Sequence, residues 1–238
     1  MRYEIVGGAP NGLTASIDGQ SLRVGAGANV AKGTSATIDL RITDDETEPV
    51  TGSVTVRITA STRPLATAND DVIPESDQGR EIVVPVLAND FNPFPDRALE
   101  IVSAAPETGV GTAQVRGDQV AVTPGAEFFG TMVVRYRVQD ATEDPDREVE
   151  GRIRLTVQGR PDAPGVPTVS SVQDRTVVLS WTPPPNNGAA ITGYTVTSTA
   201  GNYTKQCAAT TCTLDGLTNN VEYNFVVTAT NRVGESDP

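Results

Sequence analysis

The chain has 238 residues, of which 37% are hydrophobic and only 5% aromatic, and its formal net charge is −12. This charge argues against nucleic acid and against an anionic membrane surface as partners, because both attract clustered Lys and Arg. Histidine is absent, which excludes the catalytic triads and metal sites that depend on an imidazole. The length allows about two or three β-sandwich domains, and no run of about eighteen apolar residues is present to insert into a membrane.

Residues 2–61 contain short runs in which apolar and polar residues alternate, a pattern typical of strands with one buried face. The clearest run places Val54, Val56 and Ile58 on one face. A closed sandwich usually has about seven strands, so we expect this region to lack its opening strands. The predicted strands are Tyr3–Val6, Leu13–Ile17, Ser21–Val24, Ala36–Thr43 and Gly52–Thr59.

An internal repeat links this region to the next one. Residues 15–24 (ASIDGQSLRV) match residues 113–122 (AQVRGDQVAV), and two further matches lie at similar offsets. The offsets are 98, 96 and 99 residues, which indicates two copies of one β-sandwich with small differences in loop length. The two further matches are residues 38–44 with 134–140 and residues 52–59 with 151–158.

The second copy is complete. It contains ANDD at residues 68–71, VLAND at residues 86–90 and YRVQD at residues 136–140. In this order the three motifs resemble the Ig-like or cadherin-like repeats of long bacterial surface proteins. The resemblance implies an Ig-like (cadherin-like) β-sandwich for residues 66–162 and, through the internal repeat, a partial Ig-like β-sandwich for residues 1–65.

The acidity of the chain is concentrated in residues 66–162, whose net charge is −9. Carboxylates there could converge near a domain junction, and calcium takes several such oxygen ligands. The alternative is an acidic, solvated surface that keeps the protein soluble. Repeats of this kind usually carry D-x-D-G-D after VLAND, whereas residues 91–96 are FNPFPD here. No other cofactor is predicted, and the calcium candidates are Asp70, Asp90, Asp140, Asp144 and Asp146.

Residues 163–238 follow a Pro-rich linker and again show strand-like alternation. Trp181 lies in LSWTPP, Tyr194 lies in ITGYTV, and Leu217 comes six residues before Tyr223. These marks resemble a fibronectin type III domain. The resemblance implies that Trp181 and Tyr223 belong to the core, that the Tyr223 hydroxyl bonds to nearby backbone, and that the last strand is truncated. The predicted fold class is therefore all-β, with tandem immunoglobulin-like and fibronectin type III β-sandwiches.

Cys207 and Cys212 are the two cysteines of the chain, and four residues separate them. We consider two states: a disulfide that closes a small loop between neighbouring strands, and a pair of buried free thiols. The loop resembles those of bacterial secreted fibronectin modules, which favours the disulfide. A disulfide implies an oxidising compartment, so the chain is expected outside the cell or at its surface, with signal and anchor outside this fragment.

Two segments are candidates for binding a protein partner. Residues 116–118 spell the tripeptide that integrin ligands display on exposed hairpins, although a hairpin turn by itself explains the glycine. Residues 231–236 resemble the receptor-signature position of cytokine-receptor fibronectin modules, although a turn before the last strand explains them as well. The candidate residues are Arg116, Gly117, Asp118, Asn231, Gly234 and Ser236.

No enzyme is predicted, because carboxylates such as Glu107 and Glu127 would need a cleft that narrow sandwiches do not offer. The expected function is an extracellular adhesion fragment of a bacterial surface protein that contacts proteins of a host or of neighbouring cells. One alternative is a specific receptor for a host signalling protein such as a cytokine. The others are a structural spacer and an accessory module of a carbohydrate-active enzyme. The sequence identifies neither the ligand nor the oligomeric state.

Overall fold

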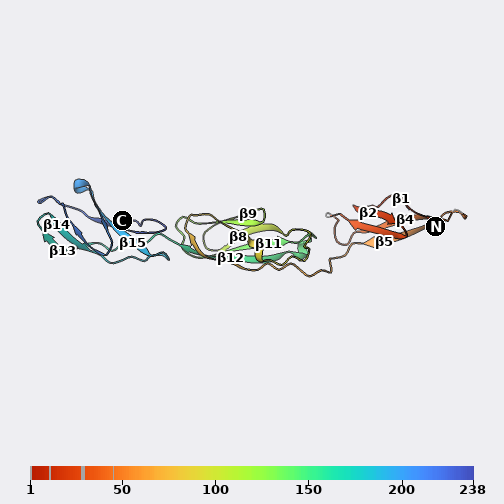
Figure 1. Ribbon diagram of the computed structural model, residues 1–238, viewed down its shortest axis with the longest axis horizontal. Helices are drawn as coiled ribbons and strands as arrows, with labels where there is room; N and C mark the ends of the chain where they lie inside the picture. Colours follow the sequence, from red (N-terminus) through yellow and green to blue (C-terminus); the bar gives the residue numbers. More distant parts are fainter. Residues whose placement is uncertain (1, 11, 28–29, 45) are drawn as a thin grey trace. The chain divides into compact units, whose positions relative to one another are not determined.

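The computed structural model describes residues 2–10, 12–27, 30–44 and 46–238. Eighteen β-strands and three short 3-10 helices lie in these residues, which confirms the all-β fold class (Figure 1). The chain divides into two compact units, and the predicted domain boundaries after residues 65 and 162 stay a prediction. The first unit is Met1–Ala66 with Phe91–Leu99 and Gln139–Val149, and the second is Thr67–Asp90, Glu100–Val138 and Glu150–Pro238.

The first copy of the repeat lies in the first unit. Three of its strands form an antiparallel sheet in the order β1-β4-β5, and the other two pair as the hairpin β2-β3. Ile38, in the middle of β4, is fully buried. Period-two alternation predicted all five strands to within two residues at each end. Their bounds are β1 Arg2–Val6, β2 Leu13–Asp18, β3 Ser21–Ala26, β4 Ser35–Thr43 and β5 Val50–Arg57.

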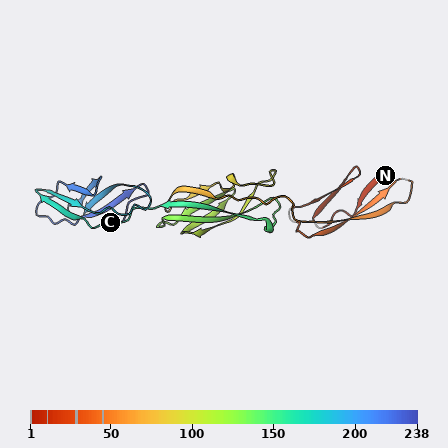
Figure 2. The same cartoon turned by 90° about the horizontal axis from the view of Figure 1, so that it is seen from below.

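The second copy forms a two-sheet sandwich in the second unit, visible in Figure 2 as the yellow and green strands. One sheet has the order β6-β12-β11-β8, and the other has the order β7-β10-β9. The inward side chains of β10, β11 and β12 are mostly Val, Ile and Leu, as the low aromatic content requires. The strands are β6 Asp71–Asp77, β7 Ile82–Val84, β8 Glu100–Thr108, β9 Gly111–Arg116, β10 Gln119–Pro124, β11 Gly130–Gln139 and β12 Val149–Gln158.

The fibronectin-like region also belongs to the second unit and has two three-stranded sheets, β13-β14-β17 and β16-β15-β18. Trp181 and Tyr194 are buried between them, with ring centroids 5.4 Å apart in an edge-on arrangement. The Tyr223 hydroxyl accepts a hydrogen bond of 3.0 Å from the amide of Thr218, as the resemblance implied. The strands are β13 Thr168–Gln173, β14 Thr176–Ser180, β15 Ile191–Ser198, β16 Tyr203–Cys207, β17 Thr211–Leu214 and β18 Val226–Asn231.

The three 3-10 helices are single turns in the connections. No helix among the described residues is long and apolar enough to cross a membrane. The helices are η1 Val86–Asn89, η2 Pro145–Arg147 and η3 Ala200–Asn202.

Gly151 makes room for the largest side chain of the second copy's core. Tyr136 is fully buried, and a Cβ placed on Gly151 would lie 2.4 Å from Cζ and from Oη of this tyrosine. The tyrosine cannot swing away easily, because its hydroxyl donates a hydrogen bond of 2.8 Å to the carbonyl of Asn69. Gly52 is the equivalent position of the first copy, and there nothing lies within 4 Å of an added Cβ.

We expect Gly151→Ala to destabilise the second copy by about 2 to 3 kcal/mol, because the added methyl group overpacks the core beside Tyr136. Gly52→Ala is the matched control and should be neutral or slightly stabilising, since alanine loses less backbone entropy on folding. Urea unfolding followed by circular dichroism measures both variants. Equal effects of the two substitutions would contradict the assigned packing.

Candidate functional site

The Arg-Gly-Asp segment forms the two-residue turn between β9 and β10. Arg116 pairs with Gln119, so Gly117 and Asp118 are the turn residues, and Gly117 has a φ of 64° that favours glycine. Asp118 is exposed. In the first copy Gly19 occupies the same place in the β2-β3 turn, with a φ of 61°. The turn geometry therefore accounts for the glycine, and recognition of the tripeptide by a partner stays a prediction.

The side chain of Arg116 already forms an ion pair within the chain. Its two terminal nitrogens donate hydrogen bonds of 2.7 Å to the two carboxylate oxygens of Glu81. Both side chains are largely exposed, so this pair contributes only about 0 to 1 kcal/mol to stability. A partner that recognises Arg116 could displace Glu81 at little cost.

Asn231 lies inside a joint between the end of β12 and the fibronectin-like region, all within the second unit. It is only 4% exposed. Its side-chain nitrogen donates to the carbonyls of Gly159 (2.8 Å), Asn186 (3.2 Å) and Ala189 (3.3 Å). Its side-chain oxygen accepts from the amides of Val233 and Gly234. The polar groups of this side chain are thus used within the chain.

Ser236 is also buried and pairs with β18. The amide of Ser236 donates to the carbonyl of Ala229 at 2.8 Å, and the Ser236 hydroxyl accepts from the amide of Ala229 at 2.9 Å. These contacts fasten the segment after β18 back onto that strand. The structure therefore places Asn231 and Ser236 at buried positions and Gly234 at a half-buried one, and their contact with a partner stays a prediction.

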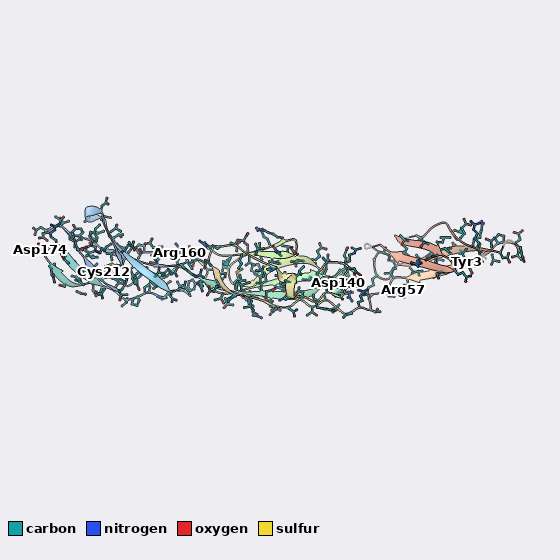
Figure 3. All side chains as sticks on the ribbon, viewed as in Figure 1. Tyr3, Arg57, Asp140, Arg160, Asp174 and Cys212 are labelled. Carbon is teal, nitrogen blue, oxygen red and sulfur yellow. A yellow bond between two sulfur atoms is a disulfide. The ribbon has the colours of Figure 1, made fainter. Side chains whose placement is uncertain are left out.

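Two arginines form further polar contacts at the same joint, and the sequence did not predict these contacts. Arg232 donates to Asp77 at 2.7 Å and also to the side chain of Gln158. Arg160, labelled in Figure 3, donates to both carboxylate oxygens of Glu127 at 2.9 and 3.1 Å. These residues are far apart in the sequence and form no periodic pattern, so spacing alone gave no signal of the joint.

The calcium candidates already have partners within the chain. Asp140 is buried and forms an ion pair with Arg147 at 2.7 Å (Figure 3 labels Asp140). Burial alone would raise the pKa of Asp140, but hydrogen bonds from Arg147 and Thr142 outweigh it and hold the pKa below its usual value. The same guanidinium group donates to the backbone carbonyls of Arg63 and Pro64.

The remaining candidates have other partners. Asp146 lies 2.7 Å and Asp144 3.7 Å from the ammonium group of Lys32. Asp70 accepts a hydrogen bond from the amide of Arg152 at 3.2 Å. No three acidic or thiol side chains in the described part of the chain are arranged to hold a metal ion. Calcium binding therefore stays a prediction.

Asp71 and Asp90 form a partly buried acidic pair beside the Tyr136 hydroxyl. Burial raises the pKa of Asp71, and the nearby charge of Asp90 raises it further. Burial also raises the pKa of Asp90; one of its oxygens accepts from the amide of Asn69 at 2.8 Å, and the other has no hydrogen-bond partner among the described residues. Burial and these two charges raise the pKa of Tyr136 above its usual value.

We expect Asp90→Asn to stabilise the protein by about 1 kcal/mol near pH 7 and by nothing near pH 3. Because the pKa of Asp90 is raised in the folded state, the folded protein binds more protons than the unfolded chain, and stability falls as pH rises through the folded pKa. The asparagine removes this cost. Thermal unfolding of the Asp90→Asn variant and of the unchanged chain at pH 3 and at pH 7 tests this prediction, and Asp118→Asn, at an exposed aspartate, is the control. A gain that is the same at both pH values would contradict the argument.

We expect Asn231→Asp to cost at least about 3 kcal/mol, because it places a carboxylate against three backbone carbonyls in a buried site. Asn224→Asp is the matched control, since Asn224 is exposed and should tolerate the change. Calorimetric unfolding of the two variants separates the effects. Similar unfolding temperatures for the two variants would show that Asn231 is not held as described.

Two family models match the chain. The bacterial Ig domain model matches residues 61–150, and the fibronectin type III domain model matches residues 162–238. Among solved structures, titin domains A168–A170 are similar with 19% identity and a TM-score of 0.42, over 96% of this chain and 80% of that one.

Relatives with similar sequences are much longer than this chain. Roundabout homolog 1 of Mus musculus is 41% identical over 125 residues, which are 50% of this chain and 7% of that protein. Contactin-5 of Gallus gallus is 34% identical over 113 residues, which are 43% of this chain and 11% of that protein. The order of the two family matches shows that the chain carries an immunoglobulin-like domain followed in tandem by a fibronectin type III domain.

Proposed function

We propose that this chain is a non-enzymatic, protein-binding part of a bacterial surface or secreted protein, which contacts proteins of a host or of neighbouring cells. The observation that carries the proposal is the tandem of an Ig-like and a fibronectin type III domain. The sequence similarity to Roundabout homolog 1 and Contactin-5 supports an adhesion-type role. Rigid sandwiches of this kind bind partners through exposed loops and strand edges.

The disulfide supports a location outside the cell. Cys207 at the end of β16 is joined to Cys212 in β17, with the sulfur atoms 2.00 Å apart (Figure 3 labels Cys212). Both cysteines are buried in the fibronectin core beside Trp181 and Leu214. Disulfides persist in oxidising compartments and are rare in the cytosol.

The aromatic side chains favour a protein partner over a polysaccharide. An accessory module for carbohydrate would need exposed aromatic platforms, but Trp181, Tyr136 and Tyr194 are buried in cores. Phe91 and Phe129 are the phenylalanines with large exposed surface among the described residues. Phe129 follows Phe128 in the chain, but neither Phe91 nor Phe129 stacks on another ring among the described residues.

A binding screen with the oxidised chain tests the proposal. The chain is immobilised and exposed to a panel of extracellular matrix proteins, integrin ectodomains and cytokines, and binding is measured by interferometry. We expect at least one saturable partner whose binding survives a raised salt concentration, as contacts beyond screened surface charge require. Absence of any partner would overturn the binding function and favour a structural spacer.

Variants of the β9-β10 turn then locate the contact. If the turn is the binding site, Asp118→Ala should weaken binding by at least about tenfold, the loss of one charged contact. Gln20→Ala changes the equivalent turn residue of the first copy and serves as the control. Equal affinities for the two variants would exclude the Arg-Gly-Asp turn and move the contact elsewhere on the chain.

A further inference from the structure

Four arginines lie together on the outer face of one sheet of the second copy. β11 and β12 are neighbours in the sheet β6-β12-β11-β8, and their inward side chains fill the core (Figure 1 labels β8, β11 and β12). The residues between these inward positions point to the opposite side, because side chains alternate along a strand. We call the outward side chains Arg135, Arg137, Arg152 and Arg154 the arginine face.

The arginine face is open to solvent, and neighbouring carboxylates balance part of its charge. Between 37% and 52% of each arginine side chain is exposed. Three carboxylates pair with these arginines at nitrogen to oxygen distances of 2.8 to 3.7 Å. Exposed pairs of this kind contribute little to stability, so a partner can displace the carboxylates. The three carboxylates belong to Asp70, Glu107 and Glu150.

The arginines are close enough together to act on one carboxylate. Arg152 donates hydrogen bonds of 2.8 and 3.2 Å to the two carboxylate oxygens of Glu107. This hydrogen bonding lowers the pKa of Glu107. The charges of Arg135 and Arg154 lower the same pKa further. Three guanidinium groups from two strands thus surround a single acidic side chain.

The first copy shows that the sandwich does not require these arginines. Its equivalent strands β4 and β5 are paired in the same order of the chain and carry one arginine and one aspartate on this face. The four arginines are therefore a property of the second copy and not of the shared fold. The equivalent residues of the first copy are Asp39, Arg41, Ser53 and Thr55.

Two of the arginines face each other across neighbouring strands. The positions equivalent to Arg135 and Arg152 are directly paired in the first copy. The close approach of Gly151 to Tyr136 fits the same register in the second copy, since their equivalents are also paired. Like charges directly opposite each other destabilise a sheet. Stability of the sheet therefore does not explain this pair, which points to a role in binding.

The spacing of the arginine face fits an extended acidic segment. Residues two apart along a strand are separated by about 6.6 to 6.8 Å, and neighbouring strands by about 4.8 Å. A partner segment in the extended conformation repeats its own side chains at the same spacing. Carboxylates at every second position therefore meet one arginine after another, and each guanidinium group can bind a carboxylate through two parallel hydrogen bonds.

We propose that the arginine face binds an extended acidic segment of a partner protein, whose carboxylates at alternate positions replace Asp70, Glu107 and Glu150. Charge complementarity favours this partner, since four positive charges face three negative ones on a chain whose net charge is −12. The inference rests on the proposed protein-binding function and names the site and the partner's chemistry. A sulfated polysaccharide also presents anions to guanidinium groups, and the experiment distinguishes it from an acidic segment.

A synthetic peptide of alternating Glu and Thr is the probe. It carries a fluorescent label and is titrated with the whole oxidised chain, and anisotropy reports binding. The titration is done at low ionic strength, because the peptide lacks the further contacts of a complete partner. A control peptide has the same composition, with Glu and Thr in blocks of two. We expect the alternating peptide to bind at least about tenfold more tightly, because it pairs more carboxylates with arginines. Equal affinities would show unspecific attraction and would overturn the proposal.

Matched arginine variants locate the contact. Arg152→Gln should weaken binding of the alternating peptide by at least about tenfold, the loss of one hydrogen-bonded charge pair. Arg80→Gln is the control, because it removes the same charge from a side chain that is 78% exposed between β6 and β7. Equal effects of the two substitutions would overturn the proposal. Arg135→Gln repeats the test if circular dichroism shows that Arg152→Gln does not fold.

Removal of a competing carboxylate should have the opposite effect. Glu107→Gln should strengthen binding of the alternating peptide by about threefold, because the peptide no longer has to displace the pair with Arg152. Glu127→Gln is the control, since Glu127 is an exposed carboxylate that pairs with Arg160 outside the arginine face. The same change in affinity for both variants would contradict displacement at the arginine face.

Further outcomes separate this proposal from the proposed function. Binding of heparin that Arg152→Gln abolishes, without binding of the alternating peptide, would assign the face to a sulfated polysaccharide and overturn the proposal. Failure of the peptide to bind, while a partner from the extracellular panel binds Arg152→Gln and the unchanged chain equally, would overturn the arginine face and leave the proposed function standing. Peptide binding without any partner from the panel would support the arginine face alone.

Discussion

Packing of aliphatic side chains between two sheets is the constraint on which this structure depends. Aromatic residues make up only 5% of the chain, so most buried volume comes from Val, Ile and Leu on inward strand faces. Such side chains are shielded from water only when a second sheet packs over them, because each one buries little apolar surface by itself. The second copy meets this condition, with Ile153, Leu155 and Val157 almost fully buried. The first copy meets it around Ile38, whereas Val54, Val56 and Ile58 stay partly exposed.

Much of this fold can be predicted from the sequence, because the period of two is a local property. Alternation located the five strands of the first copy, and the repeat offsets showed which strands of the two copies are equivalent. Trp181 lies in the core and Tyr223 packs against it, partly buried, as the fibronectin resemblance implied. Strand alternation depends on neighbours within a few residues, and each fibronectin motif lies within one continuous stretch of the sequence.

The candidate site was less accessible to such reasoning, because its contacts join residues that are distant along the chain. Arg232 and Asp77 are 155 residues apart, and neither position is part of a pattern. Burial of Asn231 depends on carbonyls from two separate connections, so the sequence could not distinguish an internal joint from an exposed recognition motif. Likewise, the five aspartates that looked like a possible metal site have basic or amide partners that the sequence does not reveal, and Asp144 and Asp146 share Lys32.

The parallel pairing of β6 with β12 has a mechanical consequence. These strands are the first and the last of the second copy, so a pull transmitted through the chain draws them in opposite directions along their common axis. Their hydrogen bonds are then loaded in shear and share the force, whereas bonds opened from one end of a hairpin break one after another. A copy closed in this way resists extension, and its resistance depends on the register between Asp71 and Ile153. Parallel pairing of β6 with β12 therefore both covers the core and places the hydrogen bonds between the two strands where a stretching force loads them together.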